Sequence, residues 1–79
     1  MTKQIKLDTG IEINGTTVKV LTMREPTVAD QLSADEIKGS DALKEITIFA
    51  NLSEISPDEI KQMTMKDYRK LQEAYRDFS

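Results

Sequence analysis

The chain has 79 residues, with 11 lysines and arginines, 14 aspartates and glutamates, and a net charge of −3. This length predicts a single domain, residues 1–79, with a thin hydrophobic core. The sequence contains neither cysteine nor histidine, which excludes disulfides and removes the commonest metal ligand. No stretch approaches the ~20 apolar residues that span a bilayer, and the first residues lack the apolar core of a signal peptide. We therefore expect a cytoplasmic protein with no membrane partner.

Acidic residues gather in the middle of the chain. Residues 1–24 carry a net charge of +2, residues 25–64 carry −6 and residues 65–79 carry +1. A nucleic-acid binder usually presents a basic face to phosphate, so we expect no nucleic-acid partner. Two interpretations of the acidic segment stay open: a solvated helix surface, or an acidic docking face for a basic partner.

An Asn-Gly pair predicts a β-hairpin over residues 1–24. Asn14 and Gly15 both accept the positive φ angle of a type I′ turn. Folding the chain about this pair predicts four cross-strand pairs: Ile13 with Thr16, Ile11 with Val18, Thr9 with Val20, and Leu7 with Thr22. Alternation then places a set of apolar side chains on one face: Ile5, Leu7, Ile11, Ile13, Val18 and Val20. Gly10 predicts a bulge or bend, so the outer half of the hairpin should depart from ideal pairing.

Leu21 and Met23 fall on the opposite, polar face in this register. One interpretation is that a helix covers them, and the other is that they contact a partner molecule. An isolated hairpin is only marginally stable in water, so the helices are expected to cover its apolar face.

Capping residues and apolar spacing predict helices in the rest of the chain. Each predicted helix begins at a cap or capping box: Thr27 for 27–33, Ser40 for 41–53, Ser56 with Glu59 for 57–63, and Thr64 for the last helix. The first of these extends at most to Ile37, because Gly39 ends it. The predicted fold class is α+β, with an N-terminal β-hairpin packed against three to four short helices over residues 27–79.

The last predicted helix carries an amphipathic stripe with aromatic side chains. Its apolar residues recur at spacings of three and four, which puts them on one helix face. One interpretation is that this stripe packs on the hairpin. The other is that its aromatic end anchors a partner, because such side chains dominate binding hot spots. The candidate partner-binding residues are therefore Leu21, Met23, Tyr68, Leu71, Tyr75 and Phe78.

The sequence offers no catalytic motif. A nucleophile would have to be serine or threonine, and no Ser-x-x-Lys or nucleophile-elbow pattern surrounds any serine. The glycines are isolated, so there is no phosphate-binding loop. The stretch that begins at Asp8 is a poor calcium loop, because its sixth position is not glycine and its twelfth, Lys19, is not glutamate. We expect no enzyme activity, catalytic residue, metal, cofactor or small-molecule ligand.

Two ordered motifs carry a resemblance to a known family. The first reads Leu-x-x-Arg-x-Pro-Thr-x-x-Asp, and the second reads Leu-x-x-Ile-Ser-x-x-Glu-Ile before a helix that contains aspartate. Their residues here are Leu21, Arg24, Pro26, Thr27 and Asp30, then Leu52, Ile55, Ser56, Glu59, Ile60 and Asp67. With the short strand before the first motif, most of the chain resembles the small phage tail assembly chaperones related to the E protein of phage P2 and protein 41 of phage Mu.

The resemblance implies a role and a set of partners. Such proteins bind the tape measure protein, the long helical protein that sets tail length, and keep it soluble during tail morphogenesis in the host cytoplasm. They are absent from the mature virion. The family is often also made as a longer product by ribosomal frameshifting, which would be a second partner. Within the first motif, Arg24, Pro26, Thr27 and Asp30 are expected to fix the strand-to-helix junction, with direct client contact as the alternative.

The oligomeric state and an alternative function are two further expectations. We expect a homo-oligomer, formed through the hairpin edge or the aromatic stripe. The alternative function is a small acidic regulatory or inhibitory module that acts on a host protein. A direct nucleic-acid binder is a third class, for which residues 41–62 could form a helix-turn-helix, but the segment lacks the Arg and Lys that would contact phosphates.

Overall fold

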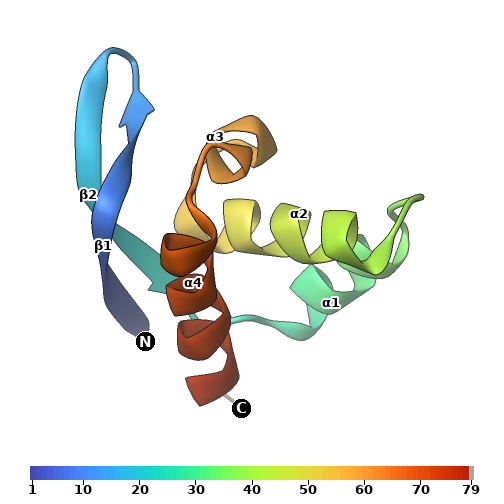
Figure 1. The fold of residues 1–79 in the computed structure, drawn as a ribbon. Helices are drawn as coiled ribbons and strands as arrows, with labels where there is room; N and C mark the ends of the chain where they lie inside the picture. The colour runs from blue at the N-terminus through green and yellow to red at the C-terminus, as the bar shows by residue number, and fades with distance from the viewer. Residues whose placement is uncertain (79) are drawn as a thin grey trace.

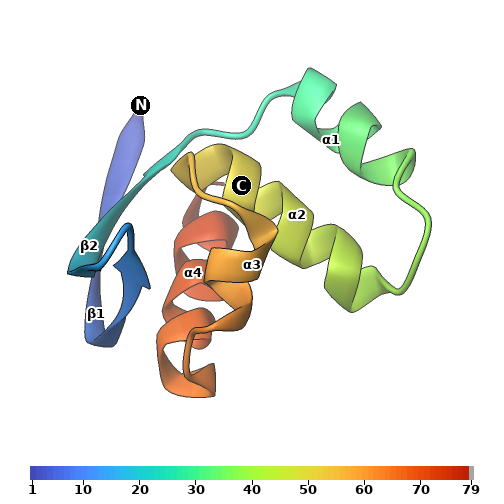
Figure 2. The same ribbon diagram turned by 90° about the horizontal axis from the view of Figure 1, so that it is seen from above.

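A computed structural model describes residues 1–78 as an antiparallel two-stranded sheet followed by helices (Figures 1 and 2). The strands are β1 (Thr2–Ile13) and β2 (Thr16–Arg24). The helices are α1 (Val28–Asp35), α2 (Asp41–Ser53), α3 (Pro57–Lys61) and α4 (Met65–Asp77). The predicted α+β class and the N-terminal hairpin are therefore confirmed.

The hairpin turn has the backbone that the Asn-Gly pair predicts. Asn14 has a φ of 53° and Gly15 a φ of 79°, which is the left-handed backbone of a type I′ turn. Next to the turn, Ile13 pairs with Thr16 and Ile11 with Val18, as predicted. The inner half of the predicted register is thus confirmed.

The outer half of the hairpin has a different register from the one predicted. Val20 pairs with Lys6 rather than Thr9, and Thr22 pairs with Gln4 rather than Leu7. Between Ile11 and Lys6, β1 advances five residues while β2 advances two, so the bulge expected at Gly10 holds three extra residues. An odd offset reverses which face each side chain of β2 occupies. The prediction that Val20 lies on the covered face was therefore wrong.

This reversal places Leu21 and Met23 in the protein core. Leu21 is 4% exposed and Met23 is fully buried, whereas Val20 is 47% exposed. The helices cover the inner face of the hairpin, and the largest buried side chains around it come from α2 and α4. The main core residues are Ile5, Leu7, Leu21, Met23, Phe49, Ala50, Leu52, Ile60, Leu71 and Ala74.

Every helix begins at the residue that the capping pattern predicts. The side chains of Thr27, Ser40, Ser56 and Thr64 each accept a hydrogen bond from a backbone N–H in the first turn. Thr27 and Ser56 also complete capping boxes with Asp30 and Glu59. These caps satisfy backbone donors that a helix leaves without internal partners, and they fix where α1 and α3 start.

Candidate functional site

The predicted junction residues lie together between β2 and α1. Arg24 donates from Nη1 and Nη2 to the two carboxylate oxygens of Asp30, at 2.7 and 2.8 Å. The backbone N–H of Thr27 donates to the same carboxylate at 2.8 Å. The Arg24 guanidinium and the Thr27 N–H together hold the pKa of Asp30 well below its usual range. This paired carboxylate therefore connects the end of β2 to the first turn of α1.

The six predicted partner-binding residues divide between the core and the surface. Leu21, Met23 and Leu71 are among the buried core residues, so they are not on the surface of the isolated chain. Tyr68, Tyr75 and Phe78 are half-buried. Each of these three aromatic residues packs at the border of the core and keeps part of its ring exposed.

Phe49 of α2 lies between the two tyrosines of α4. Its ring centroid is 5.6 Å from that of Tyr68 and 5.4 Å from that of Tyr75. Aromatic pairs at this spacing contribute beyond the area they bury. The rings therefore hold α2 against α4 and position both tyrosines at the surface between these helices.

An apolar groove opens beside Tyr68, between α2, α3 and α4. It has a volume of about 440 Å³. We call it the α2–α4 groove, and its lining is Ala42, Glu45, Ile46, Ile60, Lys61, Met63, Met65, Tyr68 and Gln72. Methionine side chains are flexible and adapt to partners of different shape. The groove is therefore suited to hold an apolar side chain of another protein.

Glu45 forms a polar bridge at the end of the groove. Its Oε1 accepts a hydrogen bond from the Tyr68 hydroxyl at 2.6 Å and another from Gln72 Nε2 at 2.8 Å. Burial, together with the Glu45 carboxylate, raises the pKa of Tyr68 well above its ordinary value. Beyond the bridge lies a second hollow of about 340 Å³, lined by Glu45, Phe49, Gln72, Tyr75 and Arg76. Tyr68 and Tyr75 thus lie in two neighbouring hollows on one face.

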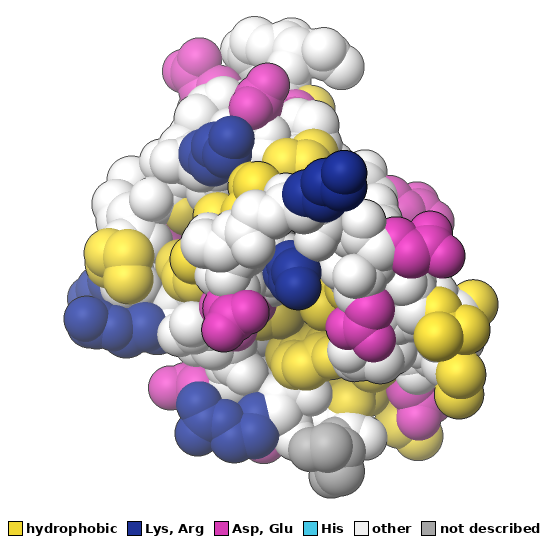
Figure 3. All heavy atoms as spheres, turned by 90° about the vertical axis from the view of Figure 1, so that its right-hand side faces the viewer, with side chains coloured by type: hydrophobic (Ala, Val, Ile, Leu, Met, Phe, Trp, Pro, Cys, Tyr) yellow, Lys and Arg dark blue, Asp and Glu magenta, His cyan; other side chains and the backbone are white. Residues whose placement is uncertain are grey.

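Exposed apolar side chains also occur outside the groove. Met65 at the groove is 62% exposed, while Val28 and Leu32 on α1 are 78% and 60% exposed. Figure 3 shows hydrophobic side chains among charged ones on the side where α1 and the start of α2 lie. The sequence did not identify Met63, Met65 and Ile46 as surface residues. Their spacing alone does not reveal that α2, the loop after α3 and the start of α4 bring them together.

The sequence did not reveal the role of Asp67 in the first turn of α4. This side chain is fully buried. Its carboxylate accepts hydrogen bonds from three consecutive backbone N–H groups of the β1 bulge: Asp8 at 2.7 Å, Thr9 at 3.0 Å and Gly10 at 3.1 Å. Burial raises the pKa of Asp67, but the three N–H groups and Lys70 lower it by more, so the carboxylate stays charged.

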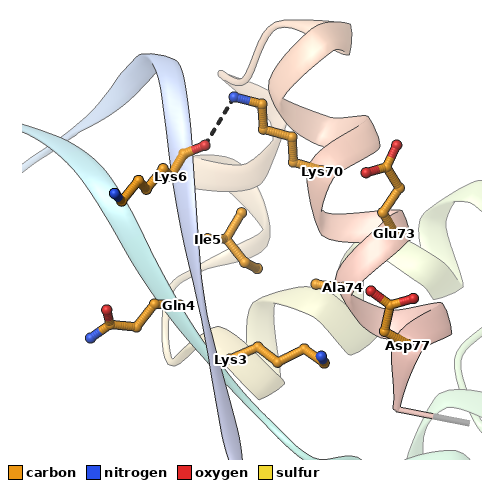
Figure 4. A pocket seen from close by; sticks show the side chains of 8 residues that line it. All are labelled: Lys3, Gln4, Ile5, Lys6, Lys70, Glu73, Ala74 and Asp77. Atoms are coloured by element: carbon orange, nitrogen blue, oxygen red, sulfur yellow. Dashed lines mark hydrogen bonds between the residues drawn. The ribbon is translucent and has the colours of Figure 1, made fainter.

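Lysines of α4 reinforce this contact with β1. Lys70 Nζ donates to the carbonyl oxygen of Lys6 at 2.9 Å and to Asp8 at 3.0 Å, and Lys66 Nζ lies 2.9 Å from Asp8. Figure 4 shows Lys70 reaching β1 above a polar hollow that Ile5 and Ala74 also line. This hollow lies along the contact between the hairpin and α4, where charged side chains already pair.

Within residues 1–78, no group of three or more Asp and Glu side chains is placed to hold a metal ion. No helix in this part of the chain has the length and apolar character of a membrane span.

The fold and the α2–α4 groove define a small α+β domain with a surface suited to binding another protein. Residues 4–79 match the family model of phage tail assembly chaperone proteins, E, or 41 or 14, so the chain belongs to this family. The resemblance seen in the two sequence motifs is thereby confirmed. Searches of curated proteins and of solved structures found no significant match. The family consists of assembly chaperones, which are typically non-catalytic and act on a protein client.

Proposed function

We propose that this protein binds the tape measure protein in the host cytoplasm and keeps it soluble during tail morphogenesis. The family match over residues 4–79 supports an assembly role with a protein client. The observation that favours a direct binding role is the α2–α4 groove, because its apolar lining is open on the surface of an otherwise charged chain. A tape measure protein exposes apolar helix faces until tail tube subunits surround it. Until then, a chaperone with an apolar groove can cover these faces.

The groove suits an apolar side chain on a helix of the client. Met63, Met65 and Ile46 supply its adaptable walls, and the tyrosine hydroxyl bound to Glu45 supplies a polar edge. Helix-in-groove recognition uses apolar residues spaced three and four apart on the bound helix. We infer that Tyr68, and with it Tyr75 in the adjoining hollow, contact the same client helix.

Co-expression with the tape measure protein tests the function. We expect the soluble fraction of the tape measure protein to rise and a complex to elute at a larger size than either protein. No change in solubility together with no complex would reject the proposed function.

A matched pair of variants tests the groove. Met65→Glu places a charge at the groove, whereas Leu32→Glu places the same charge on α1 at a similar exposure of 60% against 62%. We expect Met65→Glu to lose the complex and Leu32→Glu to keep it, with both proteins folded by circular dichroism. If wild-type protein binds and Met65→Glu binds equally well, the client contacts another surface.

A further inference from the structure

The outer edge of β1 is already occupied by α4. A strand at the edge of a sheet exposes unpaired N–H and C=O groups. In β1, Asp67 accepts from the N–H groups of Asp8, Thr9 and Gly10, and Lys70 donates to the carbonyl of Lys6. Side chains of one helix thus satisfy the edge groups in the middle of β1, and no second strand can pair there.

The turn-proximal half of β2, residues 16–20, has no such cover. Figure 1 shows it on the far side of β1 from the helices. Within residues 1–78, no hydrogen bond from outside the hairpin reaches the backbone of this half-strand. Farther along β2, Val20 and the other half of the strand line a hollow with Leu52, Ser53 and Glu54 at the end of α2. The open edge therefore comprises residues 16–20, and α2 flanks the strand from Val20 onward.

The composition of this half-strand favours pairing. Its sequence is Thr-Thr-Val-Lys-Val, and Thr and Val are among the residues most favoured in strands. It contains no proline or bulge, and Lys19 is its only charged residue, so little protects the edge. Val20 adds an apolar side chain that is 47% exposed.

We propose that the open edge of β2 pairs with the same edge of a second copy of this chain, giving a four-stranded antiparallel sheet across a twofold axis. The twofold arrangement needs no other partner, because each copy offers the same unpaired groups to the other. A register that offsets the two Lys19 side chains avoids direct opposition of like charges. The lining of the α2–α4 groove includes no residue of β2, so pairing at this edge leaves each copy its own groove.

The turn geometry identifies a backbone group that this pairing would use. In a hairpin closed by two residues, the pair that flanks the turn is hydrogen-bonded, and hydrogen-bonded and non-bonded pairs then alternate. Ile13 and Thr16 flank the turn, so the next pair, Glu12 with Thr17, is non-bonded. The N–H of Thr17 therefore points away from β1, toward the second copy.

Substitution of Thr17 tests the proposal by sedimentation velocity on the intact chain. Thr17→Pro removes the outward N–H without removing a hydrogen bond within the hairpin, whereas Thr17→Ala retains it. We expect wild type and Thr17→Ala to dimerise with similar dissociation constants, and Thr17→Pro to dimerise about tenfold more weakly, since both copies lose one hydrogen bond. A wild type that stays monomeric at high concentration, or a folded Thr17→Pro that dimerises as wild type does, would overturn the proposal.

Spin labels give a second measurement that does not depend on proline. The chain has no cysteine, so Val20→Cys and Val28→Cys each provide a single labelling site. Paired strands lie about 4.8 Å apart and advance about 3.3 Å per residue, so labels at position 20 should lie within roughly 20 Å of each other. Labels at position 28, on α1, should lie farther apart. A dimer with labels closer at position 28 than at position 20 would show that the copies associate through another face.

Discussion

The carboxylate of Asp67 on α4 accepts a hydrogen bond from the backbone N–H of Gly10 on β1, at 3.1 Å and across 57 residues of sequence. The same carboxylate accepts from Asp8 and Thr9, so one side chain satisfies three N–H groups that the bulge removes from the strand ladder. Backbone groups in a bulge otherwise have no partner in the strand ladder. The contact therefore stabilises the bulge and the docking of the hairpin on α4 together.

Asp67→Asn should destabilise the fold. Asparagine presents one acceptor oxygen and turns an NH2 group toward backbone donors, so at least one of the three N–H groups loses its partner. We expect a loss of roughly 1–3 kcal/mol in the free energy of unfolding, measured by urea denaturation. Asp77→Asn makes the same change on an exposed side chain of α4 and should have little effect. Equal stability of the two variants would show that Asp67 does not hold the bulge.

Gly10→Ala should also be destabilising, for a different reason. Gly10 has a φ of +82°, and a Cβ at this position would lie 2.7 Å from the carbonyl oxygen of Val18. Gly15 has a similar φ of +79° with no atom near its Cβ position, so Gly15→Ala carries the backbone strain alone, about 1–2 kcal/mol. Thermal melting should rank Gly10→Ala below Gly15→Ala. Identical melting temperatures would indicate that the strand moves away without cost.

Below about pH 8, stability should depend on pH only under acidic conditions. The pKa of Asp8 is lowered from 3.8 to about 2 by hydrogen bonds from Lys66 and Lys70, and the pKa values of Asp30 and Asp67 are lowered as well. A lowered pKa in the folded state means that the unfolded chain binds protons first as the pH falls. These carboxylates therefore contribute their stability above pH 3.8 and lose it as the pH falls toward their folded pKa values.

Urea midpoints at several pH values test this dependence. The chain has no histidine, so the midpoint should be nearly constant between about pH 5 and 8. It should then fall as the pH drops below about 4. A midpoint that is unchanged at about pH 3 would contradict the assignment of these carboxylates as stabilising in their charged form.

The Arg24–Asp30 pair should couple weakly despite its two short hydrogen bonds. The Arg24 side chain is 40% exposed, and solvent reduces the energy of such pairs, so a double-mutant cycle with alanine should give only a small coupling energy. Asp30→Ala alone should cost more than Arg24→Ala, since Asp30 also completes the capping box of α1. The Lys61–Asp58 pair, at 3.8 Å and more exposed, should give a coupling near zero. A larger coupling there than at the junction would contradict this ranking.

Local signals in the sequence predict most of the secondary structure. The Asn14-Gly15 turn and the capping residues act through neighbours one to four positions away, so their effect can be read directly. The size of the bulge could not be predicted, because Asp67, which binds it, is far along the chain. That bulge then decides the placement of Leu21, Met23 and Val20. A glycine within a strand and an aspartate in the first turn of a helix were the available signals, but nothing local joins them.

The α2–α4 groove was equally hard to predict. Tyr68 and Tyr75 belong to a periodic stripe, so sequence analysis identified them. Met63, Met65 and Ile46 come from different segments, and only the packing of α2, α3 and α4 brings them to one hollow. Leu71 belongs to the same stripe as the tyrosines but is fully buried. The sequence could not separate it from them, because a helix stripe does not reveal which of its members the neighbouring elements cover.

The carboxylate of Asp67 also bears on the order of events during translation. Ribosomes make β1 and β2 first, but the aspartate that binds the β1 bulge is added many residues later. Until α4 has left the ribosome, the hairpin has no helix to satisfy its three free N–H groups, and a two-stranded hairpin alone is marginally stable. The nascent hairpin therefore has no stable fold while most of the chain is being made, and the fold is completed only when α4 docks on it.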